Sequence, residues 1–124
     1  MIEALIAPVN PIVFVLDPSN DSIDVPEYVS GVVAASTGSC ISIGIQADVD
    51  GETNIKLATE IPEDDRSRMH KGFEGQIATP GKQVAVVTAE FEGVVEQPVT
   101  ADHSTVEVWV DDPDYPGEVL VLTA

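Results

Sequence analysis

Apolar and polar residues alternate most regularly within residues 39–60. Apolar side chains occupy every second position over residues 41–49, and the alternation resumes over residues 53–59. A period of two is typical of a strand with one buried face. Asp50-Gly51 separates the two runs, and this dipeptide is a strong signal for a tight turn between antiparallel strands. The pattern therefore predicts a β-hairpin, with the rest of the chain covering its apolar face.

Further short runs of strand-forming residues precede and follow this hairpin. Residues 11–17 form a continuous apolar run of strand length, which indicates a strand buried on both faces. Pro80-Gly81 predicts a type II turn that joins a second hairpin. Residues 62–69 are the most polar stretch, and we expect a surface loop or a single helical turn there. Other predicted strands or extended segments cover residues 1–7, 29–36, 105–111 and 118–123. Residues 93–98 are expected to form a loop or a short edge strand, and residues 17–21 and 23–28 are expected to be irregular.

These runs amount to about seven or eight short strands, with a turn signal about every ten residues. No stretch shows the helical period over three or more turns, and parallel sheets usually need helical crossovers. The length of 124 residues suits one domain with one core. The sequence therefore predicts a single all-β domain over residues 1–124, either an antiparallel β-sandwich or a Greek-key barrel.

The charge balance is extreme, because 22 Asp and Glu residues stand against 5 Lys and Arg, a formal net charge of −17. Binding to nucleic acid or to an anionic membrane surface needs Lys and Arg, so we expect neither kind of partner. Two explanations of the acidity stay open: solubility in high salt, or recognition of a basic protein. Residues 1–17 lack a basic n-region and contain Pro8 and Pro11, so they resemble neither a signal peptide nor a spanning helix. We therefore expect a cytoplasmic protein.

Candidate catalytic residues are few. Cys40 is the one cysteine, so it cannot form an internal disulfide, and its place at the start of an apolar strand predicts a buried, unreactive thiol. His70 and His103 lack the spacing of a zinc site and are expected to be solvated. Asp102-His103-Ser104 contains the residue types of a catalytic triad, but adjacent residues do not converge as a triad requires. We therefore expect no enzymatic activity and no cofactor.

Two acidic loops are candidates for calcium binding. Residues 48–52 and 111–114 each place several carboxylates close together, and calcium prefers oxygen ligands. The first loop does not continue as an EF-hand loop does, and its Asp-Gly dipeptide is already explained by the predicted turn. Our main interpretation assigns no metal site, and a calcium-dependent binding module stays an alternative.

A protein-binding surface is the strongest functional candidate. The alternation of Val106, Val108 and Val110 predicts the buried face of a strand, which leaves Trp109 on the opposite face. An exposed aromatic residue among carboxylates is typical of an anchor for a basic partner. Alternatively, Trp109 covers a sheet edge or belongs to a strand buried on both faces. The predicted contact residues are Glu107, Trp109, Asp111, Asp112, Asp114 and Tyr115.

Two segments resemble the competence protein J family of small β-rich inhibitors of a DNA-entry nuclease. They are Gly38-Ser39-Cys40-Ile41-Ser42-Ile43-Gly44, with the polar turn and strand that follow, and Val108-Trp109-Val110-Asp111-Asp112-Pro113-Asp114-Tyr115. Their order and approximate spacing agree over roughly the last two-thirds of the chain, whereas the family's N-terminal strand has no clear counterpart and the middle loop is shorter. The resemblance implies a β-sandwich-like binding protein that occludes the basic cleft of an enzyme.

The sequence thus predicts a non-catalytic acidic binding protein of the inhibitor or immunity type. Its expected partner is a basic protein such as a nuclease or a toxin, because opposite charges steer association. The alternatives are the calcium-dependent module and an oligomeric structural or assembly protein whose unpaired sheet edges meet in a symmetric interface.

Overall fold

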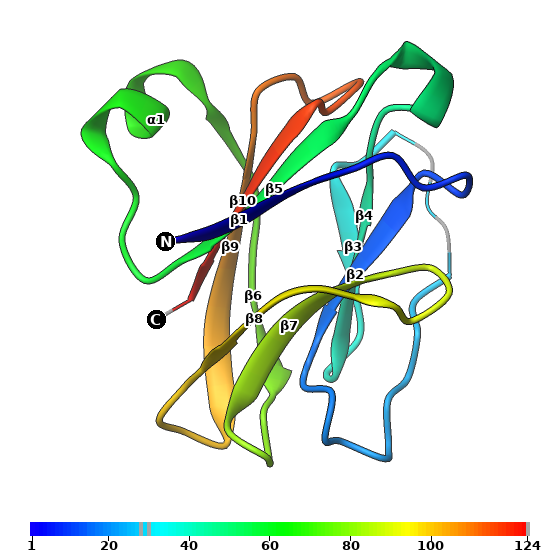
Figure 1. The fold of residues 1–124 in the computed structure, drawn as a ribbon. Coiled ribbons are helices and arrows are strands. Elements are labelled where there is room, and N and C mark those ends of the chain that lie inside the picture. The colour runs from blue at the N-terminus through cyan, green and yellow to red at the C-terminus, as the bar shows by residue number, and fades with distance from the viewer. Residues whose placement is uncertain (28, 30, 124) are drawn as a thin grey trace.

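The computed structural model describes residues 1–27, 29 and 31–123, and these form ten strands, one α-helix and one 3-10 helix. The strands make two five-stranded sheets that pack face to face (Figure 1). The predicted all-β sandwich is therefore confirmed, with ten strands in place of seven or eight. Tyr28 and Ser30, from the segments predicted over residues 23–28 and 29–36, lie outside the described residues.

The order of strands differs from the order of the chain in both sheets. Sheet A contains, from edge to edge, β1 (Ile2–Ile6), β5 (Thr53–Ala58), β10 (Glu118–Thr123), β9 (His103–Val110) and β6 (His70–Ala78). Sheet B contains β3 (Ala34–Ser36), β4 (Cys40–Gly44), β2 (Ile12–Leu16), β7 (Gln83–Thr88) and β8 (Gly93–Pro98). The 3-10 helix η1 (Asp48–Asp50) joins β4 to β5, and α1 (Glu63–Arg68) lies between β5 and β6.

The core lies between the two sheets and consists mainly of valine and isoleucine at alternate positions. Val106, Val108 and Val110 of β9 are fully buried there, as the alternation predicts. They face fully buried residues of sheet B such as Ile41 and Ile43. Branched side chains suit this layer, because they pack closely on a pleated surface.

Each sheet also has a separate apolar cluster on its outer face. On sheet B, Phe14, Leu16 and Val87 are buried beneath other side chains, which confirms the prediction that residues 11–17 are covered on both faces. Phe91 helps to cover them, since its ring centroid lies 5.5 Å from that of Phe14. On sheet A the outer cluster includes Met69 and Leu120, and it lies next to α1.

The predicted hairpin over residues 39–60 is wrong, because β4 belongs to sheet B and β5 to sheet A. A tight Asp-Gly hairpin turn needs a positive φ at both residues, but only Gly51 has one, and Asp48–Asp50 winds as a 3-10 turn. The connection therefore crosses from one sheet to the other. Alternation does not distinguish the two cases, since a hairpin and a crossover bury the same side chains.

The second predicted hairpin is wrong for the same reason, because β6 lies in sheet A and β7 in sheet B. A turn is present at Pro80-Gly81, where the Lys82 N–H donates to the Thr79 carbonyl at 2.9 Å. It is not of type II, since the positive φ falls on Lys82 at 57° and not on Gly81.

The sheets are not purely antiparallel. β10 pairs in parallel with β5 and antiparallel with β9. The two parallel strands are joined through a long stretch that includes four strands and only one short helix, so a helical crossover is not needed here. In the described part of the chain, no helix is both long and apolar enough to cross a bilayer.

Buried Asp17, directly after β2, links two turns at the lower end of the sandwich in Figure 1. Its Oδ1 accepts hydrogen bonds from the Ser19 N–H at 2.9 Å and the Ser19 hydroxyl at 2.7 Å. Its Oδ2 accepts from the Gly81 N–H at 2.7 Å. A side chain on Gly81 would collide with Ser19, so these turns fit only with glycine at that position.

We predict that Asp17→Ala lowers the free energy of unfolding by about 2 kcal/mol, because it removes the buried carboxylate that accepts from the Ser19 and Gly81 amides and so links the two turns. Asp17→Asn retains one acceptor and should cost less. Urea denaturation measures both, with Asp21→Ala in the adjacent exposed loop as the control, expected within about 0.5 kcal/mol of the wild type. A loss for Asp17→Ala no larger than that of the control would contradict this role.

Candidate functional site

Two acidic segments that are far apart in the sequence lie side by side at one end of the sandwich. The η1 segment meets the loop between β9 and β10, because the Gln46 N–H donates to the Pro116 carbonyl at 2.9 Å and the Asn54 N–H donates to the Gly117 carbonyl at 3.0 Å. The Tyr115 hydroxyl donates to the Asp50 carboxylate. Both segments lie at the upper end of the molecule in Figure 1.

We call this surface the acidic end and define it by Asp48, Asp50, Glu52, Asp112, Asp114 and Tyr115. The other residues of ranges 45–52 and 111–117 are apolar residues, one amide, two glycines and Asp111, with no Lys or Arg. The hydrogen bond from Tyr115 to Asp50 raises the pKa of the tyrosine, so its hydroxyl remains a donor at neutral pH. The acidic end is therefore a region of one sign of charge.

The loop between β9 and β10 is built around Asp111. Its Oδ1 accepts hydrogen bonds from the backbone N–H groups of Asp112, Gly117 and Glu118, at 2.9, 3.0 and 3.0 Å. The next carboxylate, Asp112, accepts from the Asp114 N–H at 3.0 Å. Asp111 is thus engaged within the loop, whereas the exposed side chains of Asp112 and Asp114 lie on its outside.

The proximity of the two acidic loops does not create a cluster of metal ligands. Across the described residues, no group of three or more His, Cys, Asp or Glu side chains is arranged to hold a metal ion. Asp111 already accepts three backbone hydrogen bonds, and Asp50 accepts a hydrogen bond from the Tyr115 hydroxyl. This arrangement gives no support to the calcium-dependent alternative.

Trp109 lies on the outer face of sheet A, as predicted, but its surroundings differ from the prediction. It packs against the cluster of Met69 and Leu120, and its Nε1 donates to Glu107 Oε1 at 3.0 Å. The Arg66 guanidinium carbon lies 5.7 Å from the ring centroid, a cation–π distance. The expected surround of carboxylates is therefore wrong, because α1 brings a cation over the ring.

An ion-pair network holds α1 against sheet A. Lys56 Nζ lies 2.6 Å from Glu118 Oε2 and 3.4 Å from Asp65 Oδ2. Arg68 Nη2 lies 2.6 Å from both Asp65 Oδ1 and Glu118 Oε2. The hydrogen bonds from Arg68 and then Lys56 outweigh partial burial and lower the pKa of Glu118 from 4.5 to about 2.

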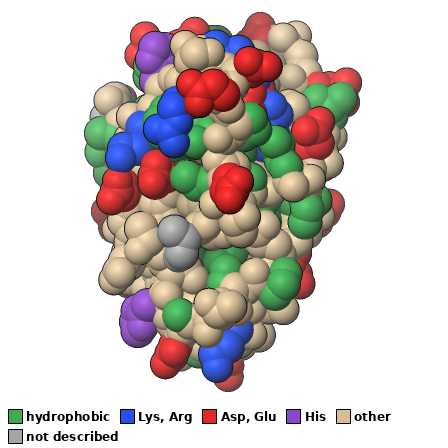
Figure 2. All heavy atoms as spheres, turned by 90° about the vertical axis from the view of Figure 1, so that its left-hand side faces the viewer, with side chains coloured by type: hydrophobic (Ala, Val, Ile, Leu, Met, Phe, Trp, Pro, Cys, Tyr) green, Lys and Arg blue, Asp and Glu red, His purple; other side chains and the backbone are tan. Residues whose placement is uncertain are grey.

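The positive charges of the chain gather around this face. Lys71 lies close by and pairs with Glu74 at 2.6 Å, so Lys56, Arg66, Arg68 and Lys71 all belong to the α1 side of sheet A. Lys82, the fifth cation, is in the turn between β6 and β7. Figure 2 shows the α1 side, with Lys and Arg side chains (blue) next to Asp and Glu (red) in its upper half.

The six predicted contact residues therefore separate into two groups. Glu107 and Trp109 contact each other and lie beside Arg66, on the outer face of sheet A. Residues 111–115 lie in the loop that contacts η1. Asp48, Asp50 and Glu52 are absent from the sequence-based surface. Their acidity was visible in the sequence, but their position beside Asp112 and Asp114 depends on the crossover from β4 to β5.

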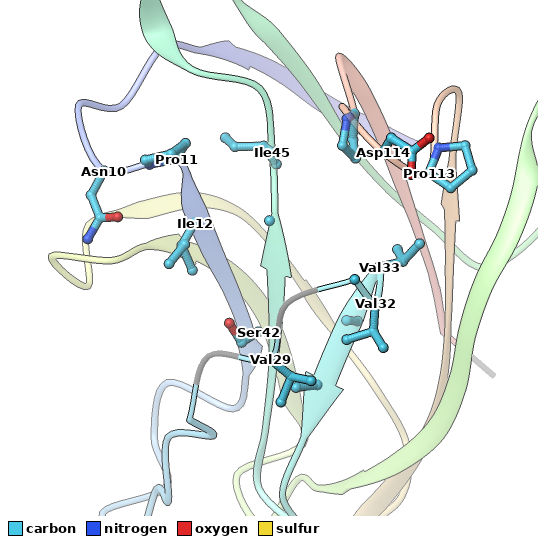
Figure 3. A pocket seen from close by; sticks show the side chains of 15 residues that line it. Asn10, Pro11, Ile12, Val29, Val32, Val33, Ser42, Ile45, Pro113 and Asp114 are labelled. Atoms are coloured by element: carbon cyan, nitrogen blue, oxygen red, sulfur yellow. The ribbon is translucent and has the colours of Figure 1, made fainter.

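A pocket of about 290 Å³ adjoins the acidic end on the side of sheet B. Its lining includes the apolar side chains of Ile12, Val33 and Ile45, while Pro113 and Asp114 approach from the loop between β9 and β10. Figure 3 shows Asp114 and Pro113 on one side of this pocket and Ile12 on the other. The pocket thus combines an apolar wall with a carboxylate beside it.

The other candidate chemical groups stay apart from this surface. Cys40 is fully buried, and burial, followed by the charge of Asp24, raises its thiol pKa to about 12. His70 and His103 are exposed at the starts of β6 and β9. The predicted buried thiol and solvated histidines are confirmed.

Comparisons of the chain with protein-family models, with curated proteins and with solved structures found no match. The resemblance to the competence protein J family therefore stays a prediction.

We predict that the ion pairs of Glu118 make stability depend on acid pH. Because the pKa of Glu118 is lowered, its pairing stabilises the fold fully above about pH 4.5, and this contribution is lost as the pH falls towards 2. Glu118→Gln should lower the free energy of unfolding by about 2 kcal/mol at pH 7. The free energy of unfolding of this variant should also depend less on pH between about 4.5 and 2.

Trp109 offers the measurement, because it is the only tryptophan and it lies beside α1. Its fluorescence should follow urea unfolding at several pH values for the wild type, Glu118→Gln and the exposed control Glu96→Gln. If the free energy of unfolding changed with pH in the same way for Glu118→Gln and the wild type, the role of this network would be contradicted.

Proposed function

We propose that this chain is a non-catalytic acidic binding protein of the inhibitor or immunity type, which covers a basic protein partner such as a nuclease or a toxin. The observation that supports it best is the separation of charge. Four of the five cations lie on the α1 side of sheet A and three of them are paired with carboxylates, while the acidic end has only negative and neutral residues.

The acidic end has the chemistry that a basic cleft would recognise. Its carboxylates come from two adjoining loops fixed by backbone hydrogen bonds, so they are held in place before a partner arrives. Preorganised groups lose little conformational freedom on binding, which favours affinity. Tyr115 adds an aromatic ring that is about half exposed, and tyrosine is common at the centres of protein interfaces.

The neighbouring pocket suits the aliphatic part of a basic side chain. Lysine and arginine carry a charged group on an apolar stem, and burial of this stem against apolar surface is energetically favourable. In this proposal the stem packs against Ile12 and Val33 while the charged group meets Asp114. A basic partner therefore fits both the charge and the shape of this surface.

The proposal is of binding and not of catalysis. The thiol of Cys40 is buried with a raised pKa, and the two histidines begin different strands. A nucleophile must lie within hydrogen-bond reach of a base to act, and these groups do not form such a pair. Glu107 and Trp109 belong to the α1 side, so we place the contact surface at the acidic end.

We predict that charge steering makes association with the partner fast and sensitive to salt. A pull-down from the source cells should recover a basic protein, and stopped-flow kinetics would then measure association at about 0.1 M and about 1 M salt. Asp112→Asn combined with Asp114→Asn should lower the association rate roughly three- to tenfold at the lower salt concentration.

The matched control is Asp21→Asn combined with Asp102→Asn, which removes the same charge at the opposite end of the sandwich. An equal loss in both double variants would attribute the effect to overall charge, as expected if the acidity serves solubility. Recovery of only acidic or neutral proteins in the pull-down would count against the proposal.

A further inference from the structure

The first strand forms the least protected edge in the described part of the sandwich. β1 pairs with β5 in an unbroken register from Ile2 to Ile6, and the other side of β1 has no strand beside it among the described residues. Its exposed residues include Leu5, which is 62% accessible, and Ile2, which is 43% accessible. An edge of this kind presents free backbone N–H and C=O groups to a further strand.

The three other edge strands carry features that discourage pairing. β3 has only three residues. β6 has an irregular register between Lys71 and Phe73 and carries charged side chains. β8 ends at Pro98, and its pairing with β7 is irregular near Val87. Short length, bulges, charges and proline are the usual means by which proteins block their sheet edges. β1 has one charge, Glu3, and neither proline nor a bulge.

We propose that the edge of β1 binds the β1 edge of a second copy of this chain, in a symmetric antiparallel pair centred on Ala4. In this register Ile2 lies opposite Ile6 of the second copy, and Ala4 lies opposite its own equivalent. Opposite residues in an antiparallel pair share a face, so this register keeps the core-facing Ala4 and Ile6 on the core side of a ten-stranded sheet.

The register is self-complementary in charge as well as in shape. It places Glu3 opposite Leu5 of the second copy, twice in the dimer, so the two Glu3 carboxylates are not directly opposed. Like charges directly opposite each other weaken a strand pair, whereas an apolar partner does not. An antiparallel pair of identical strands has two-fold symmetry, which is the commonest symmetry of protein homo-oligomers.

The net charge of −17 determines when this pair forms. Two copies repel each other over a distance that shortens as salt screens their charges. The dimer is therefore favoured by salt, whereas the proposed binding to a basic partner is weakened by salt. The two proposals can thus fail independently of each other.

Sedimentation equilibrium of the full chain at several protein concentrations, in about 0.1 M and about 1 M NaCl, tests the proposal. We expect a monomer–dimer equilibrium that shifts towards the dimer at the higher salt concentration. Leu5→Glu places a carboxylate opposite Glu3 and should weaken association about tenfold. Leu5→Lys places a cation there instead, and should associate at least as strongly as the wild type.

The matched controls are Ser36→Glu and Ser36→Lys, which make the same charge changes at an exposed position of β3 on the far side of the sandwich. Both should associate like the wild type. A monomer at all concentrations in about 1 M NaCl would overturn the proposal, as would equal effects of Leu5→Glu and Ser36→Glu. Hydrogen exchange gives a second readout: the backbone amides of residues 2–6 should be more protected in concentrated samples, and protection confined to another strand would overturn the proposed interface.

Discussion

The structure depends on one layer of branched apolar side chains held between two sheets. Residues such as Ile43 and Val108 are fully buried there, and their contacts supply most of the apolar area that folding removes from water. Both sheets also bury apolar residues on their outer faces. The cover of sheet B includes Phe91, and α1 adjoins the cluster of sheet A. α1 carries Arg66 and Arg68, so its packing on sheet A adds two cations to the face that already holds Lys56 and Lys71.

The sequence was sufficient to locate strands and to assign their buried faces, because alternation is a local property. β10 has the predicted bounds, and Val106, Val108 and Val110 face the core as expected. Strand pairing was not predictable in the same way. Ile43 and Ile55 are both buried whether β4 and β5 form a hairpin or lie in opposite sheets. The distinction depends on turn geometry and on contacts with the distant residues Pro116 and Gly117.

The candidate site shows the same division between local and distant information. The exposed acidic residues Asp112 and Asp114 were identifiable, because their loop is rich in turn-forming and charged residues. The surroundings of Trp109 were not, since Arg66 comes from a segment more than 40 residues earlier in the chain. The network of Lys56, Asp65, Arg68 and Glu118 likewise joins three separate segments, and no local pattern marks such a group.

The place of β10 within sheet A has a consequence for how the molecule folds. This strand lies between β5 and β9, so the pairs β1–β5 and β6–β9 become one sheet only after residues 118–123 have joined them. During synthesis these two halves therefore precede the strand that unites them. Contacts across long sequence separations slow folding and leave apolar surface uncovered in the meantime. The strongly negative charge of the chain opposes aggregation during this stage, because incompletely folded copies repel each other.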